Sequence, residues 1–160
     1  MIFTKTKLDG VYIISPRVFT DSRGYFFESY NKKEFEENGL FYDFVQDNQS
    51  FSSYGTIRGL HFQKGQSAQA KLVRVIKGEV LDVAVDIRKN SPTYGEHVAV
   101  HLSEENQKEI HELLVSKNIT PLDLVEECCN TYLNNCYKNK ELPFANNTNS
   151  RKSKLCWYDY

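Results

Sequence analysis

The chain has 160 residues, of which 40% are hydrophobic and 13% aromatic, and its formal net charge at pH 7 is -1. This length and composition fit one globular domain with a substantial core, and the near-zero charge excludes non-specific nucleic-acid or membrane binding as an expected function. The N-terminus predicts no signal peptide or transmembrane helix. The four cysteines lie in the last third without C-x-x-C spacing, which predicts reduced thiols and a cytoplasmic location.

The first 30 residues predict short strands joined by tight turns. Apolar residues on either side of Asp9-Gly10 predict two strands within residues 2–16. Residues 21–24 read Asp-Ser-Arg-Gly and predict a turn, which is followed by an aromatic strand at residues 25–29.

A short helix and then a run of strands follow. Asn31 is a suitable N-cap for a helix over residues 32–38, which Gly39 would end. Between residues 44 and 102, runs of β-branched and aromatic residues are separated by glycine turns, so four or more strands are expected. No helix long enough for a βαβ crossover interrupts them. The predicted sheet is therefore antiparallel, in a sandwich or a small barrel.

The pattern changes from β to α at Ser103. This residue is a suitable N-cap for one helix ending near Val115, and Thr120-Pro121 starts the pattern of a second helix. The residues after the second helix are polar and rich in asparagine, which is typical of a mobile tail.

The stretch from Phe44 to Arg88 carries polar residues of unlike type where an alternating strand would turn them to one face. They are Gln46, Asn48, Arg58, His61, Gln63 and Lys71. Because a strand buries its other face in the core, two interpretations stay open. The polar face is either a wet outer surface or the inside of a small barrel that binds a polar, anionic ligand.

His61 and Lys71 lie on either side of the Lys64-Gly65 turn. If the strands that carry them pair as a hairpin, both side chains can face one cavity. An imidazole beside an ammonium group suits proton abstraction next to a carbonyl, because the imidazole accepts a proton near neutral pH and the ammonium group stabilises the enolate oxygen. Spacing alone favours a structural or surface role for His61 over a functional one.

Three segments resemble the dTDP-4-dehydrorhamnose 3,5-epimerase family. They read DSRGYFFESY, FVQDNQSFSSYGTIRGLHFQ and QAKLVRVIKGEVLDVAVDIRKNSPTYGEHVAVHLSEEN, and the match runs from about residue 2 to Asn106. The resemblance implies a mainly β fold, a cupin-like antiparallel β-barrel or jelly roll, that forms a homodimer and needs no cofactor. It also implies epimerisation at C3 and C5 of dTDP-4-dehydro-6-deoxy-D-glucose during dTDP-L-rhamnose synthesis.

The resemblance further implies a role for each residue of the matching motifs. The catalytic residues would be His61, as the general base, and Lys71, which would steady the enolate. The substrate-binding residues would be Arg58 on the sugar diphosphate, Arg23 and Glu28 on the nucleotide and partly across the dimer, and Gln46, Asp47 and Asn48 in the same pocket. From the residues alone, Asp47 and Asn48 would be interpreted as a turn or bulge pair, and Glu28 as a solvent-facing strand residue.

No metal is expected. Cupins often bind iron or zinc through an H-x-H pair and a later histidine, whereas His61-Phe62-Gln63 lacks the second imidazole. The histidines at 97, 101 and 111 do not supply matching ligand spacing. Any catalysis is therefore predicted to use protein side chains alone.

Past Asn106 the sequence departs from the family, and its later motifs, among them the strand with the acid tyrosine, are not found. Instead KEIHELLVSKNITPLDLVEECCNTYL resembles the N-terminal helices of amidase-signature enzymes over about 30 residues, without their Gly/Ser-rich core. No amidase activity is predicted. The expected parts are an incomplete cupin-like epimerase domain at residues 1–106, a helical segment at 107–137 and a polar mobile tail at 138–160.

Two functions follow from these expectations. The first is epimerisation of a dTDP-linked 4-keto sugar by His base and enolate chemistry. The alternative is a catalytically impaired nucleotide-sugar-binding remnant without the general acid tyrosine, since Tyr132 and Tyr137 fit helix positions better than a matching motif. A third possibility, 3,4-ketoisomerase chemistry on a similar barrel, agrees less well with the wording RGLHFQ.

Overall fold

The structure, a computed structural model, describes residues 1–104, 112–115 and 153–159. Within these residues most regular structure is β, as expected, and all paired strands are antiparallel. The elements are β1 (Ile2–Lys5), β2 (Val11–Ser15), β3 (Val18–Asp21), β4 (Gly24–Phe27), α1 (Lys32–Glu37), β5 (Gln46–Ser52), the 3₁₀ helix η1 (Gly65–Ser67), β6 (Lys71–Lys77), β7 (Glu79–Val85), β8 (His97–Ser103), β9 (Glu112–Val115) and β10 (Ser153–Asp159).

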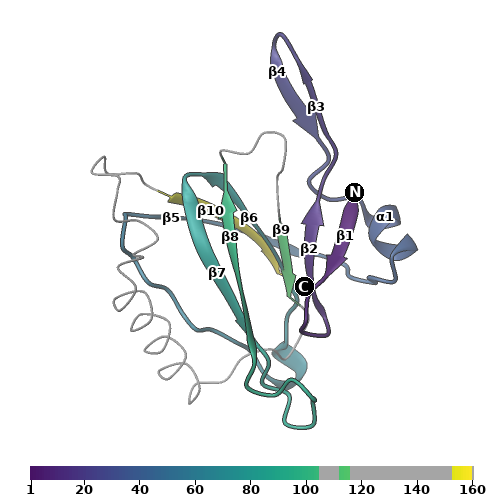
Figure 1. Ribbon diagram of the computed structural model, residues 1–160, viewed down its shortest axis with the longest axis vertical. Helices are drawn as coiled ribbons and strands as arrows, with labels where there is room; N and C mark the ends of the chain where they lie inside the picture. Colours follow the sequence, from purple (N-terminus) through teal and green to yellow (C-terminus); the bar gives the residue numbers. More distant parts are fainter. Residues whose placement is uncertain (105–111, 116–152, 160) are drawn as a thin grey trace.

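Two sheets face each other across the main core (Figure 1). The larger sheet has six strands in the order β1-β2-β9-β6-β10-β5, and β7 pairs with β8 in the smaller one. Val73 and Val75 of β6 pack against Ala84 of β7 and Leu102 of β8. These contacts define the inner face of the large sheet, which we take as the face turned toward β7 and β8.

The opposite, outer face of the large sheet is covered at the β1-β2-β9 side by α1 and the segment after it. The buried residues of this second cluster are Ile14, Phe35, Leu40, Leu72 and Leu114. Phe35 of α1 is fully buried and meets the ring of Phe3 edge to face at a centroid distance of 5.1 Å. The two faces of one sheet thus carry two separate apolar clusters, as strand alternation requires.

The predicted helix after residue 31 is confirmed. Asn31 is its N-cap, and the side-chain oxygen of Asn31 accepts a hydrogen bond from the backbone N–H of Glu34 at 3.3 Å. Gly39 follows the helix with φ of 77°, in the left-handed region that favours glycine. Cap and stop residues therefore bring Phe35 over the sheet at a defined place.

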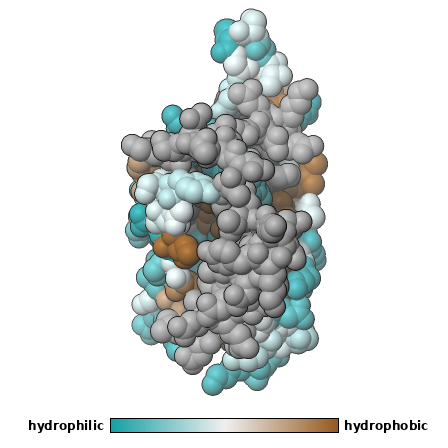
Figure 2. All heavy atoms as spheres, turned by 60° about the vertical axis from the view of Figure 1, so that its left-hand side comes forward, coloured by the Kyte–Doolittle hydropathy of each residue, from teal (hydrophilic) through white to brown (hydrophobic). Residues whose placement is uncertain are grey.

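The hairpin of β3 and β4 projects from the body of the molecule (Figures 1 and 2). Its turn is the predicted one, because Asp21 pairs with Gly24. Within the described residues the two strands pair only with each other, and Phe19, Tyr25 and Phe26 are exposed. We call residues 18–27 the arm.

The C-terminal third differs from the prediction. The helix expected from Ser103 to Val115 is wrong at both ends, because Ser103 ends β8 and Glu112–Val115 form β9. Residues 153–159 were expected in a mobile tail and instead form β10, between β5 and β6. Pairing with distant strands outweighs local helix propensity here. The helix predicted after Thr120 lies outside the described residues.

Candidate active site

The inner face of the large sheet is polar where β10 lies between β5 and β6. Position 159 of β10 pairs with Gln46 on one side and with Lys71 on the other. Since directly paired residues of an antiparallel sheet project to the same face, Gln46 and Lys71 share a face. Lys71 alternates with the core residues Val73 and Val75, so that face is the inner one.

Asn48 belongs to the same group. It lies two residues after Gln46 on β5, and its side-chain oxygen accepts a hydrogen bond from Nε2 of Gln46 at 3.0 Å. The structure therefore brings together three of the predicted residues, namely Gln46, Asn48 and Lys71, on one side of one sheet.

Asp82 faces this group from the opposite sheet and was missed from the sequence. It lies between Val80 and Ala84, which both belong to the main core, so alternation turns Asp82 inward as well. Burial raises the pKa of Asp82, and the positive charge of Lys71 lowers it to a smaller extent. By strand alternation, Asp82 and Lys71 therefore both turn into the space between the two sheets. The available signal was an acidic residue at a core-facing position of the alternating run VLDVAVDI.

Arg58 is tied to the same edge of the sheet. Its Nε donates a hydrogen bond to Oγ of Ser52 at 2.9 Å. Ser52 ends β5 and alternates with Asn48 on the inner face, whereas Arg58 lies in the loop of residues 53–70 and is exposed. The contact connects a predicted anion-binding guanidinium group to the strand that carries Gln46 and Asn48.

His61 lies in the same loop, and the hairpin expected around Lys64-Gly65 does not form. Residues 53–64 belong to no strand, and the imidazole is exposed. The physical reason is that both edges of β6 are occupied, by β9 and by β10, so no hairpin partner can pair there. Gly59, with φ of +114°, lies against the histidine, since a Cβ built on it would be 3.6 Å from Cδ2 of His61.

Three other predicted residues lie apart from the inner-face group. Arg23 is at the tip of the arm and donates hydrogen bonds to Asp21, which lower the pKa of that carboxyl. Glu28 follows the arm, is exposed and accepts a hydrogen bond from Nδ2 of Asn31 at 3.2 Å. Asp47 alternates with Gln46 and Asn48, so its side chain belongs to the outer face.

A hollow of about 640 Å³ lies beside this region, but it does not coincide with the predicted site. Its lining is Asp43, Val45, Gln63, Gln66, Ser67, Ala68 and Gln69. Of the six polar residues singled out between Phe44 and Arg88, only Gln63 lines it. The other five are placed by strand register and loop contacts instead. Among residues 1–104, 112–115 and 153–159, no three histidine, cysteine, aspartate or glutamate side chains gather as a metal site would need. No helix within those ranges is long and apolar enough to cross a membrane.

Two facing antiparallel sheets with a polar group between them define a cupin-like jelly roll. The chain belongs to the dTDP-4-dehydrorhamnose 3,5-epimerase family, because a family-wide sequence profile with that description matches residues 5–120. The resemblance found in the sequence is thereby confirmed.

Relatives named dTDP-4-dehydrorhamnose 3,5-epimerase come from archaea and bacteria. One from Methanothermobacter thermautotrophicus is 61% identical over 107 residues, which are 67% of this chain and 57% of the relative. One from Salmonella typhimurium is 57% identical over 111 residues, 69% of this chain and 61% of the relative. The chain thus spans less than two thirds of the length of these relatives.

Solved structures show the same fold. The Elizabethkingia anophelis dTDP-4-dehydrorhamnose 3,5-epimerase matches with a TM-score of 0.75 and 40% identity, over 99% of this chain and 73% of that one. The Legionella pneumophila dTDP-6-deoxy-D-glucose-3,5-epimerase, solved with dTDP-4-keto-L-rhamnose, matches with a TM-score of 0.73 and 33% identity, over 99% and 70%.

Proposed function

We propose that this chain epimerises C3 and C5 of dTDP-4-dehydro-6-deoxy-D-glucose, in the synthesis of dTDP-L-rhamnose. The observation that carries the proposal is the polar group between the sheets, in which Lys71, Gln46 and Asn48 face Asp82. The names of the relatives and the ligand of the Legionella structure support the substrate class.

The chemistry needs a base, a cation and a ketone. The 4-keto group acidifies the C–H bonds at C3 and C5, so the imidazole of His61 takes the proton and the electron pair of the C–H bond passes into an enolate. Lys71 stabilises the enolate oxygen as its charge develops. A proton from solvent then adds to the opposite face and inverts the carbon, and His61 releases the proton it took to solvent. Asp82, which turns into the same space, would attract the ammonium group of Lys71.

The remaining residues bind the nucleotide part of the substrate. Arg58 pairs with the diphosphate, for which a guanidinium fork is suited. Arg23 and Glu28 lie on or beside the arm, away from the inner-face group of their own chain. In a homodimer, the arm would carry them to the site of the second copy, and its exposed aromatic residues would be covered there.

Solvent isotope exchange tests this function directly. The protein is incubated with the dTDP-4-keto sugar in deuterated water, and deuterium at C3 and C5 is followed by NMR. We expect exchange faster than inversion, because the acid that completes inversion belongs to a motif that the sequence does not contain. Wild-type protein that exchanges neither position above the rate without enzyme contradicts the function.

A nucleotide-sugar-binding remnant is the second candidate. It is favoured by the exposure of His61 outside any strand. It predicts calorimetric binding of dTDP, weakened by Arg23→Ala, with no deuterium exchange. Product NMR also separates epimerisation from 3,4-ketoisomerisation, since the latter moves the carbonyl to another carbon.

A further inference from the structure

Ser52 and Arg58 form a side-chain contact that links the loop of residues 53–70 to β5. Oγ of Ser52 accepts a hydrogen bond from Nε of Arg58 at 2.9 Å. Ser52 is partly buried as the last residue of β5, whereas Arg58 is exposed in irregular chain. The strand is therefore the fixed partner, and the guanidinium group is the one that is held.

The nitrogen that Ser52 engages decides what Arg58 can still do. A guanidinium group has five N–H donors, and this bond uses only the one on Nε. The four N–H groups on the two terminal nitrogens form the fork that binds two phosphate oxygens at once. Holding Nε restricts the side chain without using that fork, so less rotamer freedom is lost when an anion binds.

The charge of the holding group matters as well. Arg23 is held by the carboxylate of Asp21, and Arg88 by the carboxylate of Asp86. A carboxylate neutralises the guanidinium charge and competes with an incoming anion. The Ser52 hydroxyl is neutral, so Arg58 is oriented without losing its positive charge to its holder.

We propose that Ser52 is a positioning residue that orients Arg58 toward the diphosphate of a nucleotide ligand. The inference rests on the proposed function, which supplies the ligand, and adds to it a residue that touches no substrate. Through Arg58, Ser52 affects the binding of the phosphate part of the ligand and leaves the binding of the nucleoside part unchanged.

The test compares Ser52→Ala with Ser52→Thr, which restores the hydroxyl, and with Ser50→Ala on the same strand and face. Calorimetry measures the binding of dTDP and of thymidine, which has no phosphates. Loss of the hydroxyl is expected to weaken dTDP binding about tenfold, in line with one charged hydrogen bond. Thymidine binding should stay constant, Ser52→Thr should recover most of the loss, and Ser50→Ala should match the wild type.

Arg58→Ala completes a double-mutant cycle. If Ser52 acts through Arg58, adding Ser52→Ala to Arg58→Ala weakens dTDP binding no further. In exchange assays the Ser52→Ala loss should be in KM, with kcat retained, whereas a general structural defect lowers both. Thermal unfolding checks that each variant is folded.

Different outcomes overturn the proposed function and the role of Ser52. Wild-type protein that binds no dTDP overturns the proposed function and this inference together. Wild-type binding that Ser52→Ala leaves intact overturns the inference alone, as does an equal loss of thymidine binding or an additive double mutant.

Discussion

Two loops of this molecule hold polar residues in opposite ways. In the loop of residues 86–96, between β7 and β8, Asp86 is 0% exposed and its carboxylate accepts hydrogen bonds from Arg88, Ser91 and Thr93. Its backbone N–H also donates to the carbonyl oxygen of Glu96 at 2.9 Å. In the loop of residues 53–70, Arg58 and His61 are exposed instead.

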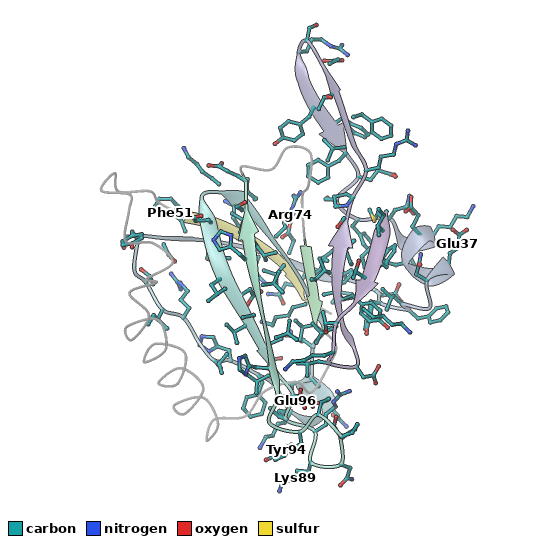
Figure 3. All side chains as sticks on the ribbon, viewed as in Figure 1. Glu37, Phe51, Arg74, Lys89, Tyr94 and Glu96 are labelled. Carbon is teal, nitrogen blue, oxygen red and sulfur yellow. The ribbon has the colours of Figure 1, made fainter. Side chains whose placement is uncertain are left out.

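The difference separates polar groups that are paired with one another inside the fold from polar groups that are exposed. Figure 3 shows Lys89, Tyr94 and Glu96 together where β7 turns into β8. The charges at the base of that loop are compensated within the chain, which stabilises the turn. Exposed cationic side chains do little for folding. The exposed side chains of Arg58 and His61 are therefore expected to contribute little to stability.

The largest effect is expected at His61. His61→Asn should lower the rate of deuterium exchange by about 10²–10⁴-fold, the usual contribution of a general base, and leave thermal stability unchanged because the side chain is exposed. NMR exchange rates and a melting curve measure the two properties. If His61→Asn lowers stability strongly and leaves exchange intact, His61 serves folding and not catalysis, which contradicts the role proposed for its loop.

Asp86 should show the reverse behaviour. Asp86→Ala leaves Arg88 and two hydroxyl groups without their acceptor, and about 3 kcal/mol of the free energy of unfolding should be lost. Urea unfolding measures this loss. Ser91→Ala is the matched control, since it removes one bond to the same carboxylate and should cost about 1 kcal/mol. Equal losses in the two variants would contradict a cluster centred on Asp86.

The same cluster predicts an acid dependence. Hydrogen bonds from Arg88 hold the pKa of Asp86 well below its ordinary value of 3.8. A carboxyl whose pKa is lowered on folding stabilises the protein at neutral pH, and this contribution is lost as the pH falls below 3.8. Wild-type stability should therefore decrease more steeply in acid than that of Asp86→Ala.

Most of the correct predictions about the fold rest on local sequence patterns. The cap at Asn31, the turn at Asp21 to Gly24 and the alternation within β7 are signals carried by neighbouring residues. The strands β9 and β10 are different, because each lies between partners distant in sequence. Their pairing follows from register and burial, which local propensity does not encode.

The candidate site shows the same limit. Gln46, Asn48 and Lys71 are polar residues in strand-forming sequence, and such residues are visible without coordinates. Asp82 was missed because its partner on the other sheet is a matter of tertiary packing. The hairpin for His61 was wrong because the edge of β6 that it needs is taken by β10.

A smaller effect tests whether the conformation of the His61 loop matters. Gly59 has φ of +114°, so Gly59→Ala strains the backbone beside His61 by about 1–2 kcal/mol. Exchange should fall about tenfold. Gly55→Ala is the control, because Gly55 has φ of +77° and no neighbour within 4 Å. If both variants lose exchange equally, the effect is one of general loop strain and not of the position of His61.

The smallest effect is expected at Asp82, which lies four residues before Asp86. The pKa of Asp82 is raised, whereas that of Asp86 is lowered. Burial raises the pKa of Asp82, so its charge is unfavourable in the folded state despite Lys71. A carboxyl with a raised pKa in the folded state reduces stability as the pH rises above its ordinary value of 3.8.

The free energy of unfolding of Asp82→Asn should therefore equal that of the wild type in acid and exceed it at neutral pH by about 1 kcal/mol. Deuterium exchange should become slower, because Lys71 loses a charged neighbour. Unfolding curves from pH 3 to pH 7 measure the stability difference. A variant less stable than the wild type at neutral pH would mean that the Lys71 charge outweighs burial. Asp82 would then stabilise the fold as Asp86 does. Whether a buried carboxylate stabilises a protein depends on its hydrogen-bonded and charged partners, and burial alone does not decide it.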